Sequence, residues 1–395
     1  MDNNADNFEV VINRRGTGSR KWDDVAAVFG NDKVLPLWIA DMDFAAPSNA
    51  VEKIIERAKH PIYAYNNNDL EFVEAIVNWT KNRHNWDIKN EWIVQTPGVV
   101  PAIVMSILAL SKENEGVIIQ TPVYPPFFAA IEDNKRVVVK NELVFNKGRY
   151  EINFVDLEEK FADKNNRIFL LCSPHNPVGR VWTKSELEKI NKLAIKYNIQ
   201  VLSDEIHSDI VYEGHKHTVF ASLAKAENSE VVTFMAASKT FNIAGLNTSY
   251  VIIPCGYKRE LIRGQINRLH INRNNIFGVL ATKEVYKSGE EWLKNLLLYL
   301  EKNADTLVEF IETRLPKIKV VKPEGTFLAW LDFSAYFDRS DELNKFLIEK
   351  ANLGLNSGIS FGEQGECFAR LNFATSRNIL LEALLQLEEA LKIID

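Results

Sequence analysis

Short continuous apolar runs recur through the middle of the chain, and between them apolar residues return every three or four positions. Such runs are typical of strands buried on both faces, and the longer spacing is typical of helices packed on them. The predicted strands are Val117–Gln120, Arg136–Lys140, Ile168–Cys172, Gln200–Ser203, Val231–Met235 and Tyr250–Ile253. The helices predicted between them include Val99–Leu110, Lys184–Tyr197 and Tyr257–Leu269. Strands separated by helices need crossover connections, which predicts a mainly parallel sheet with helices on both faces.

The pattern changes near residue 290. A long helical pattern is followed by two strand-like runs, a helix, a strand and a final helix: Glu290–Leu315, Ile318–Val321, Thr326–Phe333, Asp341–Lys350, Cys367–Phe373 and Arg377–Ile394. Near the other end, residues 8–35 are predicted to form an extended polar arm on a neighbouring surface, followed by a helix at Ser48–Ala58. We therefore expect an α/β protein. Its three-layer large domain covers residues 50–290, and a smaller α+β terminal unit joins residues 1–49 to 291–395.

Composition narrows the possible functions. The chain has 395 residues, a net charge of −6 and 46% hydrophobic residues, so it has ample core and no electrostatic reason to bind nucleic acid. Cys172, Cys255 and Cys367 lie far apart, which argues against a disulfide framework or a metal site. Val99–Leu110 is too short to span a bilayer, and Met1–Asp6 lacks the features of a signal peptide. We expect a cytoplasmic protein that binds neither nucleic acid nor membranes.

Two charged residues follow predicted strands, and ligands of open parallel sheets bind at the carboxyl ends of the strands. Lys239, next to Ser238, comes after the run Val231–Met235. Poor hydration there favours the free amine, which can form a Schiff base with an aldehyde cofactor. Asp204 ends the run Gln200–Ser203, and a buried acid needs a partner such as a pyridinium nitrogen. A surface lysine and a capping or salt-bridged aspartate are the alternatives.

Other loops carry candidate binding groups. Prolines on both sides hold Asn176 in a fixed direction within Ser173–Gly179. Gly98 and Val99 lie at a predicted helix start, where backbone amides attract phosphate. The ring of Tyr124, in a proline-rich loop, offers a surface on which a flat cofactor can stack. Ordinary turns and a core tyrosine are the alternatives.

Arg370 lies within an apolar predicted strand, and a buried arginine needs an anion. A carboxylate held by the guanidinium would satisfy it, each charged hydrogen bond contributing about 1.5–3 kcal/mol. A structural ion pair is the alternative. His215 and His217 form a His-x-His pair, but no third ligand has suitable spacing, so a polar loop is favoured over a metal site.

Along the chain these motifs follow in the order Gly98, Tyr124, Asn176, Asp204, Lys239 and Arg370. The full set in this order, over nearly the whole chain, resembles the fold-type I enzymes that use pyridoxal 5′-phosphate (PLP), in the class I/II aminotransferase family. Several stretches are similar to the cystathionine β-lyase branch of C–S lyases. They are Lys21–Asp23, Trp38–Phe44, Pro174–Trp182, Asp204–Asp209 and Ser238–Leu246. The resemblance implies a PLP-dependent C–S β-lyase that cleaves cystathionine or related cysteine S-conjugates to a thiol, pyruvate and ammonia. An amino-acid aminotransferase, and a bifunctional enzyme that also binds a regulatory protein, are the alternatives.

The resemblance also implies roles for individual residues. Lys239 would carry PLP as a Schiff base and move the Cα proton, and Asp204 would keep the ring nitrogen protonated. The other implied cofactor-binding residues are Gly98, Val99, Tyr124, Asn176, His207 and Ser238, with Tyr65 reaching PLP from the second subunit of a homodimer. The implied substrate-binding residues are Arg370, which would bind the α-carboxylate, with Ile39, Ala40 and Asn176.

Two positions depart from the pattern of many aminotransferases. His207 stands where many have a tyrosine, three residues after Asp204. Asn247 stands where many have an arginine that helps to neutralise the phosphate of PLP. The sequence therefore names no cation for that phosphate.

Overall fold

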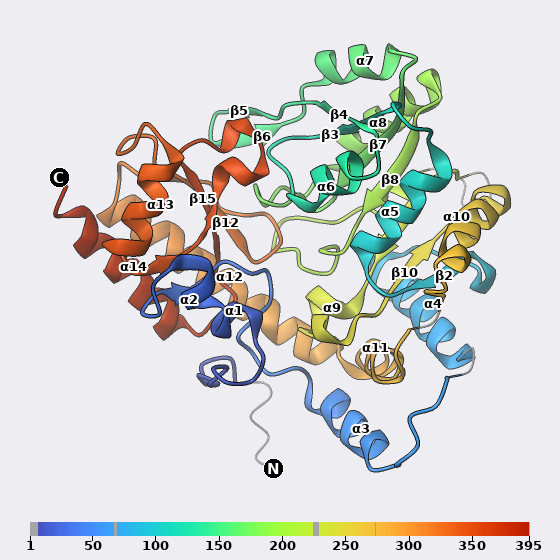
Figure 1. The fold of residues 1–395 in the computed structure, drawn as a ribbon, viewed down its shortest axis with the longest axis horizontal. Helices are drawn as coiled ribbons and strands as arrows, with labels where there is room; N and C mark the ends of the chain where they lie inside the picture. The colour runs from blue at the N-terminus through green and yellow to red at the C-terminus, as the bar shows by residue number, and fades with distance from the viewer. Residues whose placement is uncertain (1–6, 67–68, 224–228, 273, 395) are drawn as a thin grey trace.

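A seven-stranded sheet forms the centre of the computed structural model, which describes residues 7–66, 69–223, 229–272 and 274–394 (Figure 1). Its strands are β2 (Ile93–Thr96), β3 (Gly116–Ile119), β4 (Val137–Lys140), β7 (Asn166–Cys172), β8 (Gln200–Asp204), β9 (Val232–Met235) and β10 (Ser249–Ile252). The order across the sheet is β2-β10-β9-β8-β7-β3-β4. Only β10 runs antiparallel to its neighbours among these strands, so the predicted mainly parallel sheet is confirmed.

Alternate strand residues enter two separate cores, one on each face of this sheet. Val117 and Ile119 pack into one core, whereas Ile118 between them packs into the other. The first core is closed by α5 (Val99–Leu110), α6 (Pro126–Glu132) and α10 (Gly256–Arg268). Helices of the second core include α4 (Leu70–His84), α7 (Phe154–Ala162), α8 (Lys184–Tyr197) and α11 (Ile276–Ser288), and α3 (Ser48–Ala58) lies against α11 (Figure 1). This arrangement explains why the strands are apolar throughout.

A second, antiparallel sheet is formed by the C-terminal part of the chain. Its order is β11-β12-β15-β14, from β11 (Lys319–Val320), β12 (Leu328–Asp332), β14 (Asn356–Ser357) and β15 (Phe368–Asn372). The helices of this part are α12 (Glu290–Arg314), α13 (Ser340–Glu349) and α14 (Arg377–Leu391). The division of the chain into residues 50–290 and a unit of 1–49 with 291–395 stays a prediction.

The N-terminal region differs from the extended arm predicted for residues 8–35. It contains α1 (Arg20–Asp23) and α2 (Val25–Phe29), and β1 (Leu35–Pro36) pairs in parallel with β13 (Leu353–Gly354) of the same chain. The prediction of an extended arm is therefore wrong over the two helices. Contacts with residues distant in sequence override the polar local pattern, since the side chain of Lys21 is buried against Asp43.

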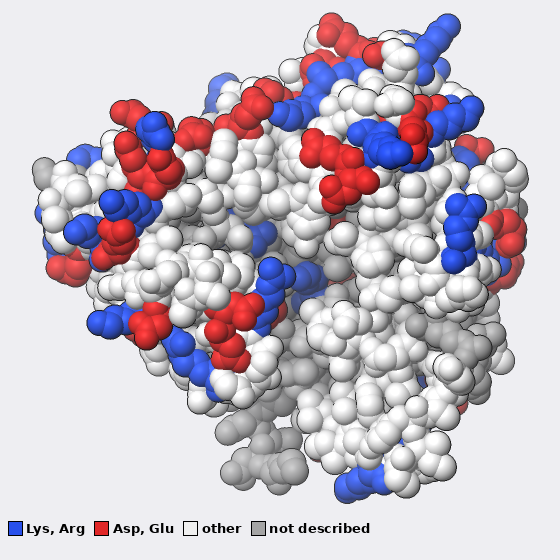
Figure 2. All heavy atoms as spheres, viewed as in Figure 1, with Lys and Arg blue, Asp and Glu red and all other residues white. Residues whose placement is uncertain are grey.

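Over the described ranges, no helix is both long enough and apolar enough to cross a bilayer, and residues 1–6 lie outside those ranges. Figure 2 shows acidic and basic side chains interspersed over the face in view, which is hollowed near its centre where basic side chains are visible. His215 and His217 lie in a loop, as the polar-loop interpretation expects, but only His215 is exposed. The ring of His217 is buried with Nε2 2.7 Å from Glu205 Oε2, because the buried Glu205 carboxylate needs a polar partner.

Candidate active site

Lys239 lies just beyond β9, in the short helix α9 (Ala237–Thr240). Its Nζ donates a hydrogen bond of 2.5 Å to the carbonyl of Ala40. Next to it, the hydroxyl of Thr240 donates to Asp209 at 2.8 Å, which ties the helix to the loop after β8. Burial lowers the pKa of Lys239 to about 8, although the nearby Asp41 charge acts in the opposite direction. Roughly a tenth of the amine is therefore free at pH 7, far more than for an exposed lysine.

Asp204 ends the neighbouring strand β8 and is buried. Its carboxylate accepts a hydrogen bond of 3.1 Å from the backbone N–H of Ile206. No ion pair joins Asp204 to a basic side chain within the part of the chain that the structure describes, so the salt-bridged alternative does not apply there. Burial raises the pKa of Asp204 to about 7, and the charge of Glu205 adds to the rise. Such a carboxyl group fits a ligand that brings its own cationic nitrogen.

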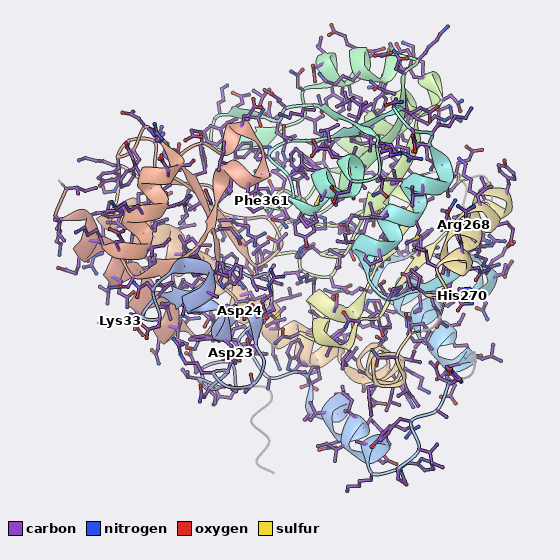
Figure 3. The ribbon with its side chains drawn as sticks, viewed as in Figure 1. Asp23, Asp24, Lys33, Arg268, His270 and Phe361 are labelled. Carbon is purple, nitrogen blue, oxygen red and sulfur yellow. The ribbon has the colours of Figure 1, made fainter. Side chains whose placement is uncertain are left out.

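Arg370 lies on β15 with only 4% of its surface exposed. It donates to the Trp38 carbonyl at 2.7 Å, to Asn356 Oδ1 at 2.6 Å and to Asn176 Oδ1 at 3.2 Å. Its guanidinium also lies over the ring of Phe361, which Figure 3 labels, at 5.1 Å.

All of these partners are neutral. Among the residues described, no carboxylate pairs with Arg370, and its Nε has no acceptor, so the structural ion pair considered from the sequence does not form there. Burial lowers its pKa to about 10, so Arg370 remains a cation at neutral pH. The site therefore offers a buried positive charge to an incoming anion.

Tyr124 and His207 lie within the same electrostatic neighbourhood. Burial raises the pKa of Tyr124, on which the charges of Arg370 and Asp204 also act. Burial lowers the pKa of His207 to about 3, and the charges of Lys239 and Arg370 lower it further, so its imidazole is neutral. The Nδ1 of His207 is buried without a hydrogen-bond partner in the structure. The structure thus brings both rings to the group formed by the lysine, the aspartate and the arginine.

Gly98, Val99 and Ser238 lie at starts of helices. Gly98 precedes α5 and Val99 is its first residue, directly after β2, while Ser238 lies in α9. Because β2 runs parallel to β8 and β9, its carboxyl end lies at the edge of the sheet that carries Asp204 and Lys239. The predicted phosphate-binding segments therefore share one edge with the charged groups.

Tyr65 lies elsewhere, in the segment between α3 and α4. Its side chain is 90% exposed, whereas Asp204 and Arg370 are buried. Its predicted role in the site of a second subunit stays a prediction. Asn247 is exposed in a left-handed turn, with φ 45°, and offers no positive charge.

Sequence reasoning missed two asparagines that support the site. Asn372 Nδ2 donates to the carbonyls of Ile39 and Asp41, both at 2.6 Å. Asn242 Nδ2 donates to the carbonyls of Met42 and Phe44 at 2.9 and 2.7 Å. The sequence held one signal for Asn372, because it lies two positions after Arg370 on a strand and so shares its face.

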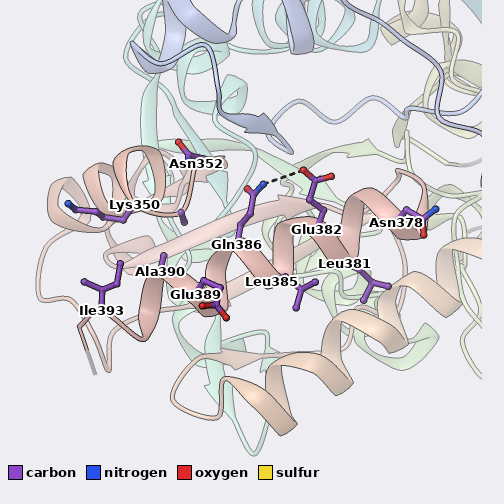
Figure 4. Close-up of a pocket in the computed structure, with 11 residues that line it drawn as sticks. Lys350, Asn352, Asn378, Leu381, Glu382, Leu385, Gln386, Glu389, Ala390 and Ile393 are labelled. Carbon is purple, nitrogen blue, oxygen red and sulfur yellow. Dashed lines mark hydrogen bonds between the residues drawn. The ribbon is translucent and has the colours of Figure 1, made fainter.

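One cavity lies near this group, and larger hollows lie apart from it. A cavity of about 420 Å³ borders the segment of residues 41–45 and is also lined by Arg14 and Asn242. A groove of about 580 Å³ lies between α14 and the residues that follow α13, and Figure 4 shows its lining, which includes none of the predicted site residues. The candidate site is therefore the cluster at the sheet edge.

Known proteins resemble the chain over nearly its full length. Residues 32–386 match the family described as aminotransferase class I and II. The chain is 41% identical over 385 residues to cystathionine β-lyase PatB of Bacillus subtilis (strain 168), covering 98% of this chain and 100% of that protein. Cystalysin of Treponema denticola, whose crystal structure contains PLP, superposes with a TM-score of 0.95 at 37% identity, over 98% of this chain and 99% of that one. The PLP-bound C–S lyase of Staphylococcus hominis complexed with L-cycloserine superposes with a TM-score of 0.91 at 32% identity, over 97% of this chain and 98% of that one.

The fold and these matches define a fold-type I PLP enzyme architecture, and the chain belongs to the class I and II aminotransferase family. Full-length similarity to PatB and to the two solved lyases then places it in the cystathionine β-lyase, or C–S lyase, branch. Both the fold and the resemblance predicted from the sequence are confirmed.

Proposed function

We propose that this chain is a PLP-dependent C–S β-lyase that cleaves cystathionine or related cysteine S-conjugates to a thiol, pyruvate and ammonia. The observation that carries the proposal is a pair of buried ionisable groups, Asp204 and Arg370, near the amine of Lys239. Among the described residues, neither group has a counter-ion in hydrogen-bond contact. A ligand that complements them needs a cationic nitrogen, an aldehyde and a carboxylate. PLP with an amino acid supplies all three, and similarity to C–S lyases selects the reaction.

The side chains fit PLP in the following way. Asp204 would hold the proton of the ring nitrogen. The cationic ring would then be the missing partner of this carboxyl group, whose pKa burial raises to about 7. Asn176 Oδ1 already accepts from Arg370, so its amide N–H groups are left to donate to the ring hydroxyl oxygen. Tyr124 packs on the ring, and the neutral His207 lies beside it.

The phosphate is assigned to the helix starts. The backbone N–H groups at Gly98 and Val99 begin α5, a helix of 12 residues, and Ser238 adds a hydroxyl group at the same edge of the sheet. Tyr65 of the partner subunit adds a further donor. No cation in the site is assigned to the phosphate.

Substrate binding and proton transfer use the remaining groups. Arg370 holds the α-carboxylate with the help of the backbone at Ile39 and Ala40, which places the Cα–H of the substrate near Lys239. When bound, PLP acts as an electron sink for this carbon. Lys239 takes the Cα proton as a free amine, which its pKa of about 8 permits.

Elimination then breaks the Cβ–S bond. The electron pair from the Cα–H bond forms the Cα–Cβ double bond, and the sulfur leaves with the pair of the broken bond. A thiol is a good leaving group because its pKa is only about 8.5. One water molecule is consumed when pyruvate and ammonia are released, so atoms and charges balance.

A homodimer is part of the proposal. Ile62, Tyr63 and Tyr65 are 62%, 58% and 90% exposed, and a second copy would cover these large side chains. Light scattering after size exclusion should give the mass of two chains. A single-chain mass at micromolar concentration would refute this part alone.

The activity test is incubation with L-cystathionine. We expect pyruvate, detected with lactate dehydrogenase, and one equivalent of free thiol, and Lys239→Ala should form neither. Borohydride reduction followed by peptide mapping should place the cofactor on Lys239. Amino transfer that depends on an added keto acid, without pyruvate, would support the aminotransferase instead.

A further inference from the structure

Both key cations of the site donate to one short stretch of backbone, residues 38–44, which we call the 38–44 segment. The Trp38 carbonyl accepts from Arg370 at 2.7 Å, and the Ala40 carbonyl accepts from Lys239 at 2.5 Å. The carbonyls of Ile39 and Asp41, which alternate with these two along the chain, both accept from Asn372. Four consecutive carbonyls are thus bound by side chains of the site or of the strand that carries Arg370.

The 38–44 segment has no helix or strand of its own to hold it. Asn242, three residues after Lys239, binds its far end: the amide donates to the carbonyls of Met42 and Phe44 and accepts from the Met42 N–H at 3.0 Å. One backbone hydrogen bond, from the Asp43 N–H to the Ala374 carbonyl at 2.9 Å, also holds the segment, but its carbonyls are bound mainly by side chains.

A group of charged residues anchors the segment from the N-terminal side. Asp43 accepts from Lys21 at 2.8 Å, from Arg14 at 2.7 Å and from the indole N–H of Trp22 at 2.9 Å. Arg14 also binds both carboxylate oxygens of Asp41, at 2.9 and 2.7 Å. We call Arg14, Lys21 and Trp22, with their two aspartates, the charge clamp.

One ion pair of the charge clamp is partly exposed and another is buried. The side chains of Arg14 and Asp41, which border the cavity of about 420 Å³, are 20% and 22% exposed, whereas those of Lys21 and Asp43 are 0% and 4% exposed. Burial alone would raise the pKa of Asp43, but the neighbouring Lys21 and Arg14 outweigh it and lower the pKa. Buried ion pairs add little stability over apolar residues, but removal of one partner leaves an uncompensated buried charge.

We propose that the charge clamp is a positioning device for the reaction: it sets the 38–44 segment so that its carbonyls hold the Lys239 amine and the Arg370 guanidinium in the geometry that the substrate needs. Lys21, Arg14 and Trp22 are positioning residues in this role and touch neither substrate nor cofactor. The inference rests on the proposed roles of Lys239 and Arg370. Small displacements of reacting groups have large effects on rate, about 100-fold for 1 Å, so the clamp acts on catalysis from a distance.

Lys21→Met tests the proposal, because it removes the buried ammonium group and keeps the length of the side chain. We expect kcat/KM for cystathionine to fall about tenfold or more, with a higher KM because the Arg370 guanidinium loses its fixed acceptor. Trp22→Phe removes a single N–H donor to Asp43 and provides a milder variant that retains the ion pairs. It should change kcat/KM in the same direction, by about threefold.

A second measurement does not need lyase activity. In the full chain freed of cofactor, the reactivity of Lys239 toward an amine-labelling reagent, followed by mass spectrometry across pH, reports its pKa. Both the hydrogen bond to the Ala40 carbonyl and the charge of Asp41 act on this pKa, so Lys21→Met should shift the labelling midpoint by about half a pH unit. If the unsubstituted protein lacked lyase activity, the proposed function would fail while this measurement still tested the clamp.

The control is Glu388→Gln. Glu388 binds Arg314 through both carboxylate oxygens, which ties α12 to α14 away from the site, so its loss lowers the melting temperature without moving the 38–44 segment. We expect unchanged kcat/KM and an unchanged Lys239 midpoint in this variant. Folded Lys21→Met and Trp22→Phe proteins with unaltered KM, kcat/KM and midpoint would overturn the proposal. Equal effects in Glu388→Gln would overturn it as well.

Discussion

Replacing Asp204 by asparagine should make the cofactor-free protein more stable at pH 8 while it removes the lyase activity. The carboxylate of Asp204 is buried, and its hydrogen bond comes from the backbone N–H of Ile206. Asparagine has nearly the same shape and can accept the same hydrogen bond, but it carries no charge. The substitution therefore isolates the free energy of holding an unpaired carboxylate in this site.

The size of the effect follows from the pKa. Its rise from 3.8 to about 7 corresponds to about 4 kcal/mol in favour of the protonated form, at about 1.4 kcal/mol per pKa unit. Between these two values the folded protein binds the proton more tightly than the unfolded chain, so the free energy of unfolding falls as pH rises. Above about pH 7 the loss is complete. The asparagine variant lacks this loss, so its advantage should grow from near zero at pH 4 to about 4 kcal/mol at pH 8.

The assay is urea unfolding of both cofactor-free proteins at several pH values between 4 and 8, followed by circular dichroism and tryptophan fluorescence. Asp87→Asn, at a carboxylate whose side chain is 81% exposed, is the matched control and should show no such trend. A difference in stability that does not change with pH, or an asparagine variant that is less stable at pH 8, would refute the reasoning. Activity should fall because asparagine cannot hold the proton of the ring nitrogen.

Three further predictions follow from the site and the core. Arg370→Lys exchanges a planar fork for a point charge, so kcat/KM for cystathionine should fall about 10- to 100-fold, chiefly through KM, in steady-state assays. Leu300→Ala, at a fully buried position of α12, should reduce the free energy of unfolding by about 2–5 kcal/mol in urea titrations and leave kcat of the folded enzyme unchanged. Tyr65→Phe should weaken PLP binding, measured by fluorescence titration, without loss of the dimer, and unchanged affinity would argue against its contact with the phosphate.

Much of the large sheet could be predicted because its strands are buried on both faces and read as continuous apolar runs. The same runs located Asp204 and Lys239, since polar residues at the ends of buried strands stand out against their apolar neighbours. Helix α4 also has a local signal, because Asp69 caps it by accepting from the Phe72 N–H. The antiparallel direction of β10 had no local signal, because direction depends on which strands become neighbours.

The order of the chemical groups along the chain predicted the family, and the stretches similar to C–S lyases favoured that reaction class over an aminotransferase. Local sequence could not determine what holds those groups in place. Asn372 binds the carbonyl of Ile39 across 333 positions of sequence, and Lys21 is buried by an aspartate 22 positions away, so neither contact leaves a periodic pattern. Only the tertiary structure brings these partners together, because burial and hydrogen bonding depend on neighbours in space rather than along the chain.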